Sequence, residues 1–332
     1  MFEWEIVNNS TSNMNRIIQL LVNTEVVYIH GSFGDVYLQT ALVAEYNRNE
    51  EKRYAIMIDE KYKQFCEKLI KNSTQIFFIN GNQILNVLSE NKIFGKVHGL
   101  PTRLLPTVYP YIAEAISLGK LSYIDFLRIV LKNKNNGKIE ALEKYNAKEL
   151  ILEAKKIIEK ENLNVGKTIL LSCENNTHQE FEDELWLKII EIIKSKGLEP
   201  CLNASGTLLG KYQKLRNSQI KRIEVPPYLI TSIVDVCGGY IVGTNGFQTI
   251  QGLFNEKTMG IHLINNYNGI GVDVEDKFGN HYDISILALS KQLPEQFQNK
   301  QIELSIEKNI NFNEIEKSIE KMIKENISLV SG

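Results

Sequence analysis

The sequence predicts an α/β protein with two domains, each built on a parallel sheet that carries helices on both faces. The chain has 332 residues, enough for two cores at roughly 100–200 residues per domain. Short β-rich runs alternate with helical patterns, and this alternation starts at Glu25 and again at Thr168. Strands that alternate with helices pair in parallel and form doubly wound sheets. We expect one domain at 1–165, a second at 166–310, and a helix within 311–332 that packs across both.

The first series opens with a strand at 25–30 that stops at a glycine turn. A helix is expected at 35–46, where apolar residues recur at near-helical spacing. The other elements expected here are strands at 54–58, 75–79 and 96–99 and helices at 62–70 and 84–90. The aromatic segment 101–131, interrupted by prolines, is expected to be helical and to cover a sheet edge or shape a pocket. A charged helix at 147–161 and a linker at 162–166 lead to the second series.

The second series repeats this plan with a strand at 168–173 and a helix at 181–196 that Gly197 ends. The elements expected after them are strands at 199–203, 221–225, 240–242 and 258–264 and helices at 227–236 and 247–254. A last helix at 313–327 carries an apolar stripe that should pack inward. The stripe consists of Ile315, Ile319, Met322 and Ile323.

The composition is that of an ordinary globular protein, with 43% hydrophobic and 23% charged residues. Lys and Arg number 38 and Asp and Glu number 40, so the net charge of −2 provides no general attraction for nucleic acid. The four cysteines form no CxxC pair and no Cys/His group at zinc spacing, and they are interpreted as buried apolar side chains.

The N-terminal region has Glu3 and Glu5 where a signal peptide would have a basic start and an apolar run. No segment approaches the roughly 18–20 apolar residues of a spanning helix, and even 123–131 contains Asp125 and Arg128. We therefore expect no transmembrane segment and a cytoplasmic location. The abundance of Asn, Lys and Ile indicates a bacterium with an AT-rich genome.

The sharpest motif is the turn at 30–35, which joins the first strand to the first helix. Gly31 and Gly34 permit a tight turn, and free N–H groups at the helix start favour a negative charge. Asp35 follows the carboxyl end of the strand, where open α/β sheets bind ligands, and its carboxylate could accept a proton from an attacking hydroxyl. Capping of the helix is an equally good interpretation of Asp35. The residues expected around an acceptor are Gly31, Ser32, Phe33, Gly34 and His98.

Two nucleotide-binding motifs are not matched. The turn is GxxGD where a dinucleotide fingerprint has GxGxxG, although Asp59 after the second strand imitates the ribose-binding acid. No GxxxxGK[ST] loop occurs, so phosphate transfer from a nucleoside triphosphate has no support.

A second glycine turn lies at 243–246, between a strand and a helix of the second series. The backbone amides of Asn245, Gly246 and Phe247, with the hydroxyls of Thr244 and Thr249, could hold a diphosphate without a metal. A purely structural turn is the alternative.

The loop after the first strand of the second series holds further candidates. Glu174, Thr177 and His178 could contact a sugar or phosphate, and a solvated polar loop is an equally good interpretation. The acidic run 273–276 is interpreted as a surface loop, and no metal site is expected. His262 adjoins a strand and is interpreted as a structural histidine, as His98 would be if it has no functional role.

The order of these motifs over residues 25–265 resembles the heptosyltransferase-like glycosyltransferases. The sequence from Gly34 to Leu42 matches the Gly-Asp turn and aliphatic helix that open the acceptor domain of that family. The resemblance implies a GT-B fold, in which two Rossmann-like domains with doubly wound parallel sheets face a central cleft. It also implies that Asp35 is the general base and that 244–249 binds the donor diphosphate. The family has an acid and a histidine in that donor turn, and this chain has neither.

The resulting hypothesis is an inverting, metal-independent glycosyltransferase with a nucleotide-sugar donor and no cofactor. The acceptor is a glycan, a lipid-linked molecule, a protein or a small molecule, and the chain could form an oligomer. Two alternatives remain open: a sugar-nucleotide epimerase of the same shape, and a noncatalytic, nucleotide-binding pseudo-transferase.

Overall fold

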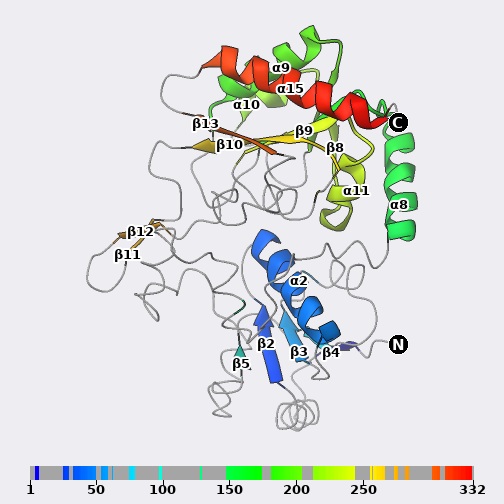
Figure 1. The fold of residues 1–332 in the computed structure, drawn as a ribbon, viewed down its shortest axis with the longest axis vertical. Coiled ribbons are helices and arrows are strands. Elements are labelled where there is room, and N and C mark those ends of the chain that lie inside the picture. The colour runs from blue at the N-terminus through cyan, green and yellow to red at the C-terminus, as the bar shows by residue number, and fades with distance from the viewer. Residues whose placement is uncertain are drawn as a thin grey trace. The chain divides into compact units, whose positions relative to one another are not determined.

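A computed structural model describes the parts of the chain that form the two predicted sheets and their main helices (Figure 1). The described residues are 4–6, 25–29, 33–49, 54–58, 62, 75–78, 97–98, 128, 147–173, 181–203, 212–243, 255, 257–265, 273–275, 281–283, 301–306 and 311–330. The chain divides into two compact units. One comprises 1–146 with 275–280, and the other comprises 147–274 with 281–332.

The first unit contains a five-stranded sheet in which all neighbouring strands are parallel. Its strands, in the order β1-β4-β3-β2-β5, are β1 (Trp4–Ile6), β4 (Gln75–Phe78), β3 (Tyr54–Ile58), β2 (Glu25–Ile29) and β5 (Val97–His98). The chain runs outward from β2 to β4, and β5 then lies on the other side of β2. The four strands expected from the sequence are confirmed. Strand β1 was not expected, because a strand of three residues is too short to show an alternation.

Helix α2 (Phe33–Asn49) follows β2 and packs against it (Figure 1). It begins two residues before the expected start and continues three residues beyond the expected end. Both apolar and polar side chains between 36 and 42 are buried, including Gln39 and Thr40. A helix surrounded by protein on all sides has no polar face, which is why the apolar stripe in this segment is weak.

The second unit contains a six-stranded parallel sheet in the order β13-β10-β9-β6-β7-β8. Its strands are β6 (Thr168–Ser172), β7 (Glu199–Asn203), β8 (Lys221–Ile223), β9 (Gly239–Val242), β10 (Gly260–Asn265) and β13 (Gln301–Ile306). The chain moves from β6 to β8 on one side and returns to place β9 on the other side of β6. This reversal is that of a doubly wound Rossmann-like sheet.

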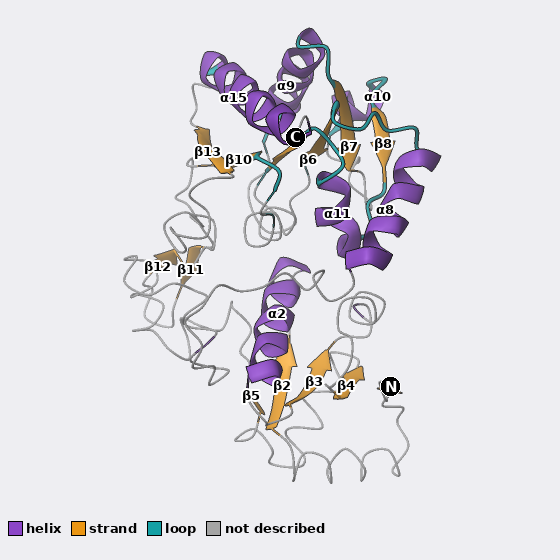
Figure 2. Cartoon of the chain, turned by 45° about the vertical axis from the view of Figure 1, so that its right-hand side comes forward, coloured by secondary structure: helices purple, strands orange, loops and turns teal. Residues whose placement is uncertain are grey.

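Helices cover both faces of this sheet, as a parallel sheet requires. Helices α9 (Asp183–Ser195) and α15 (Phe312–Val330) lie on one face, and α11 (Ile230–Val234) and α8 (Ala147–Lys160) lie on the other (Figure 2). The predicted stripe of α15 faces inward, since Ile315, Ile319 and Met322 are buried. No described helix is long and apolar enough to cross a membrane.

Asn326 fixes the C-terminal part of α15 to the amino ends of two strands. Its amide nitrogen donates to the carbonyl oxygens of Gly238 and Met259, each at 2.9 Å, and its carbonyl oxygen accepts from Met259 N–H at 2.8 Å. The packing of this helix across both domains stays a prediction.

Some expectations for the second series were wrong. The helix expected at 227–236 is correct only in part: it begins as a 3-10 turn, η6 (Pro227–Leu229), and continues as the short α11 only to Val234. The acidic run expected as a loop forms β11 (Asp273–Glu275), which pairs with β12 (His281–Asp283). Neither β13 nor α10 (Gln213–Asn217) was expected, because β13 follows a long polar stretch and α10 has little more than one turn.

Several expected helices fall on residues outside the described part. They are 84–90, 247–254, all of 62–70 except Tyr62, and all of 101–131 except the buried, helical Arg128.

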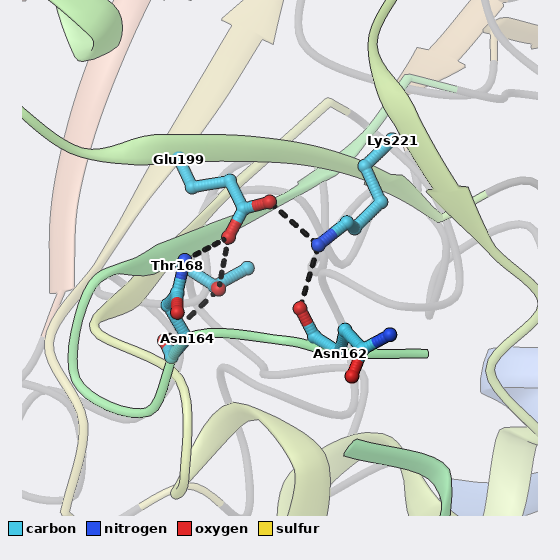
Figure 3. A network of polar contacts seen from close by, with 5 residues as sticks. All are labelled: Asn162, Asn164, Thr168, Glu199 and Lys221. Atoms are coloured by element: carbon cyan, nitrogen blue, oxygen red, sulfur yellow. Dashed lines mark hydrogen bonds and ion pairs between the residues drawn. The ribbon is translucent and has the colours of Figure 1, made fainter. Parts of the chain in front are cut away.

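The segment expected as a linker, 162–166, is a turn bonded to the amino edge of the second sheet (Figure 3). Asn164 Nδ2 donates to Glu199 Oε2 at 2.8 Å, and Lys221 Nζ lies 2.6 Å from Glu199 Oε1. The same Lys221 donates to the carbonyl oxygen of Asn162 at 2.6 Å (Figure 3). The domain boundaries expected from the sequence stay predictions.

The three described cysteines, Cys173, Cys201 and Cys237, are buried, as expected. Burial raises the pKa of Cys201 and of Cys237 to about 12 in each case. These two thiols are therefore protonated at neutral pH and are not nucleophiles. Cys66 lies outside the described residues.

A buried polar pair lies between β9 and β10. The Tyr240 hydroxyl and His262 Nε2 are 2.9 Å apart in a hydrogen bond, and both residues are fully buried. Burial lowers the pKa of His262 to about 3, so the ring is neutral. The expectation that His262 is structural is confirmed.

We expect Gly260→Ala to lower the free energy of unfolding by about 1–3 kcal/mol, because overpacking a core costs about that much. A Cβ at Gly260 would lie 2.1 Å from an atom of the Tyr240 ring. The matched control is Gly243→Ala, whose Cβ would meet its nearest neighbour, Trp186, at 3.5 Å. Urea denaturation of both variants measures the difference, and equal stability would contradict this packing.

We expect acid to weaken the fold through His262. In the unfolded chain the ring has the ordinary pKa of about 6.5, whereas in the folded protein its pKa is about 3. Between these values the unfolded chain binds a proton that the folded protein does not. Its contribution to stability is complete above pH 6.5 and falls by up to about 1.4 kcal/mol per pH unit below it. The His262→Gln variant keeps a partner for Tyr240 and does not titrate, so its unfolding free energy should fall less steeply between pH 6.5 and 4. If urea denaturation gives the same pH dependence of the unfolding free energy for the wild type and the variant, this role of His262 is refuted.

Candidate functional site

The first candidate site lies between β2 and β5, where the strand order of the first sheet reverses. Helix α2 begins four residues after the end of β2, and Asp35 is the third residue of that helix. His98 ends β5 and is in register with Val27 of β2. The fold therefore places β5, which carries His98, beside β2, and the helix that carries Asp35 follows β2 at the edge where doubly wound sheets bind ligands.

The described part of this site is its backbone and the start of α2. Gly34 is buried, and the half-buried Phe33 contacts Tyr37 edge to face, with ring centroids 6.5 Å apart. The side chains of Asp35 and His98, and the residues Gly31 and Ser32, lie outside the described part. Their expected roles stay predictions.

The second candidate site is the reversal of the second sheet, between β6 and β9. Ser172 is in register with Val242, and Gly243 N–H donates to the Ser172 carbonyl oxygen at 3.0 Å. The chain leaves the sheet after Cys173 on one side of this reversal and after Gly243 on the other. The expected donor residues all fall on the two segments that follow and lie outside the described part. They are Glu174, Thr177, His178, Thr244, Asn245, Gly246, Phe247 and Thr249.

Aromatic side chains pack beside the second reversal. Phe181 and Trp186 contact each other edge to face, with ring centroids 6.3 Å apart, and both pack against Gly243. Trp186 is fully buried, and its indole N–H has no hydrogen-bond acceptor among the described residues. The end of β9 is therefore supported by tightly packed apolar side chains.

Three polar side chains join the ends of neighbouring elements at the same edge. Tyr212 donates its hydroxyl hydrogen to the Cys173 carbonyl oxygen at 3.0 Å, and Asn203 Oδ1 accepts from Val225 N–H at 3.3 Å. The carboxylate of Asp183 accepts N–H bonds from the first turn of α10, at 3.0 Å and 3.3 Å. These residues could not be predicted from the sequence, because each hydrogen-bond partner is distant in the sequence and belongs to no local motif.

The two sides of the reversal differ in charge. Helix α9 follows the β6 side, and Glu182, Asp183 and Glu184 lie at its start. Glu184 forms an ion pair with Lys214, and the hydrogen bond from that lysine lowers the pKa of the Glu184 carboxyl. Negative side chains oppose an anion at this helix start, whereas the segment 244–249 contains no acidic residue.

No group of three His, Cys, Asp or Glu side chains that could hold a metal ion occurs within the described ranges.

Comparison with known proteins shows similarity at the level of the fold. No family model matches the chain, and no curated protein matches it. A glycosyl transferase family 9 protein from Veillonella parvula is 15% identical, with a TM-score of 0.54 over 92% of this chain and 95% of that one. The E. coli ADP-heptose lps heptosyltransferase II is 8% identical, with a TM-score of 0.55 over 91% of this chain and 99% of that one.

A structure of E. coli heptosyltransferase WaaC with ADP is 8% identical, with a TM-score of 0.50 over 91% of this chain and 99% of that one. These similarities, together with the two parallel sheets, define the fold class. The chain has the GT-B fold of the heptosyltransferases and is remotely similar to them.

Proposed function

We propose that this chain is an inverting, metal-independent glycosyltransferase that moves a sugar from a nucleoside diphosphate donor to an acceptor hydroxyl. The observation that carries the proposal is the position of Asp35 in the first turn of α2, directly after β2 and at the reversal of the first sheet. Open α/β sheets bind ligands at this position, and the fold is shared with glycosyltransferases.

In the proposed reaction Asp35 accepts the proton of the acceptor hydroxyl as its oxygen attacks the anomeric carbon. The bond from that carbon to the diphosphate oxygen breaks on the opposite side, so the configuration inverts. The diphosphate leaves with the bonding electron pair. Backbone N–H groups of Asn245, Gly246 and Phe247 and the hydroxyls of Thr244 and Thr249 stabilise its negative charge.

The other expected site residues complete the two halves of the proposed site. Glu174, Thr177 and His178 would contact the sugar or phosphate of the donor. On the acceptor side, Phe33 and Gly34 belong to the start of α2 and His98 to β5, with Gly31 and Ser32 in the turn before α2. The proposed acceptor is a glycan, a lipid-linked molecule, a protein or a small molecule, and the proposed location is the bacterial cytoplasm.

One similar protein was solved with ADP, which supports a nucleoside diphosphate as the donor's leaving group. The charge difference at the second reversal supports the β9 side as the diphosphate site. The acids at the start of α9 would repel a diphosphate bound on the β6 side.

The Asp35→Asn variant should lower turnover about 10²- to 10⁴-fold, because an amide cannot accept the proton. Its affinity for a nucleoside diphosphate should stay within about twofold of the wild type, because the proposed donor site lies in the other unit. Release of diphosphate from the donor with acceptor present measures turnover, and calorimetry measures binding. Glu191→Gln is the charge-matched control, since the Glu191 side chain on α9 is 67% exposed. Normal turnover of the Asp35 variant would remove this residue from the role of base.

The Thr244→Ala and Thr249→Val variants should each raise the dissociation constant for ADP, UDP or GDP about 10- to 100-fold, the loss expected for one hydrogen bond to a charged group. Calorimetric titration of the free diphosphates tests this without requiring the acceptor. Unchanged affinity in both variants would refute the assignment of this turn to the diphosphate.

Incubation with nucleotide sugars alone separates the proposal from its alternatives. An epimerase converts the donor without any acceptor. A noncatalytic protein binds nucleotide but shows no turnover with a broad panel of acceptors, whereas a transferase needs donor and acceptor together.

A further inference from the structure

Helix α8 has an outward face that the proposed reaction does not use. The helix packs against η6 and α11, and its inner side chains Leu150, Ala154 and Ile158 are at most 4% exposed (Figure 2). Tyr228 of η6 donates its hydroxyl hydrogen to Glu153 Oε1 of α8 at 2.8 Å. These contacts determine which face of α8 points away from the second sheet.

Two large aliphatic side chains of α8 are exposed to water. Ile151 is 39% exposed and Leu152 is 61% exposed. Val165, in the turn that follows the helix, is the only other exposed large apolar side chain in the described part of the chain. Two of these three side chains are therefore adjacent on one helix, and their transfer to an apolar phase would be favourable.

Positive charges surround the more exposed of the two aliphatic side chains. On an α-helix, the nearest surface neighbours of a residue are those three and four positions away. For Leu152 these neighbours are Lys148, Glu149, Lys155 and Lys156, which are all exposed. Three of the four are cationic in a protein whose net charge is −2, so the charge here is opposite in sign to that of the whole chain.

We propose that this protein docks on the anionic headgroups of a lipid membrane through the α8 surface, which consists of Lys148, Ile151, Leu152, Lys155 and Lys156. The lysine ammonium groups contact lipid phosphates. The two aliphatic side chains enter the boundary between the headgroups and the acyl chains. This docking is separate from the reaction proposed above and does not depend on it.

The composition of α8 favours a membrane over a protein partner. Protein interfaces are enriched in aromatic residues and Arg and depleted in Lys. Helix α8 contains no aromatic residue and no Arg, and all its basic residues are Lys. Lysines beside exposed aliphatic side chains instead complement an anionic surface that covers an apolar layer.

Helix α15, on the other face of the second sheet, provides a matched control (Figure 2). Lys317, Lys321 and Lys324 are exposed on it, and the exposed acids Glu320 and Glu325 lie between and beside them. None of the described side chains of α15 is a large apolar residue that is exposed. Replacing these three lysines changes the total charge as much as replacing the three of the α8 surface.

Flotation of the full chain with lipid vesicles measures the docking. The wild type should bind vesicles of phosphatidylglycerol and phosphatidylcholine, should not bind vesicles of phosphatidylcholine alone, and should be released by added salt. Replacing Lys148, Lys155 and Lys156 together by Gln should lower the membrane partition coefficient at least about 10-fold. Leu152→Ser should lower it about 3- to 10-fold, because the inserted side chain is lost.

The control, in which Lys317, Lys321 and Lys324 are all replaced by Gln, should keep its partition coefficient within about twofold of the wild type. All substituted side chains are exposed, so the melting temperatures should stay close to that of the wild type.

Three results would each overturn the proposal: a wild type that does not bind the anionic vesicles, equal losses in the two triple variants, and unchanged partition of Leu152→Ser. A fourth is a wild-type dimer, seen by sedimentation in the absence of lipid, that the α8 variants dissociate. The α8 surface would then bind a second copy of the chain in place of a membrane.

Discussion

Parallel pairing of β6 with β7 on one side and β9 on the other is the constraint on which the second unit depends. Parallel strands need helical crossovers, and these crossovers cover both faces of the sheet and bury its central strands β6 and β9 completely. The reversal of strand order at β6 makes the segments after β6 and β9 diverge at one edge. The same arrangement recurs at β2 and β5 in the first unit, so each unit offers one such edge for a ligand.

The two edges of the second sheet serve different purposes. At the amino edge, side-chain bonds from Asn326, Glu199 and Lys221 close the structure on itself. Gly238 lies so close to the turn before β6 that a Cβ there would be 2.5 Å from the Gly166 carbonyl oxygen. At the carboxyl edge, Tyr212 and Asp183 support segments that continue away from the sheet. The proposed binding of the donor lies at this carboxyl edge.

At the carboxyl edge of the second sheet, the β6 side and the β9 side differ in charge and in burial. The acids at the start of α9 disfavour an anion on the β6 side, and the buried Phe181 and Trp186 support the backbone at Gly243 on the β9 side. The buried thiols of Cys201 and Cys237 and the neutral ring of His262 take no part in proton transfer at neutral pH. In the proposed mechanism the general base is Asp35 of the first unit.

The sequence by itself determined the α/β class, most of the strands and the position of Asp35 after β2, because these depend on local alternation and on glycine turns. It did not reveal β13, the 3-10 turn at Pro227 or the pairing of β11 with β12, since short or edge strands carry too little pattern. The bonds of Tyr212 to Cys173 and of Asp183 to Lys214 arise only when α10 folds back beside β6 and α9. Such contacts between residues more than thirty positions apart depend on strand order, which only the tertiary structure decides.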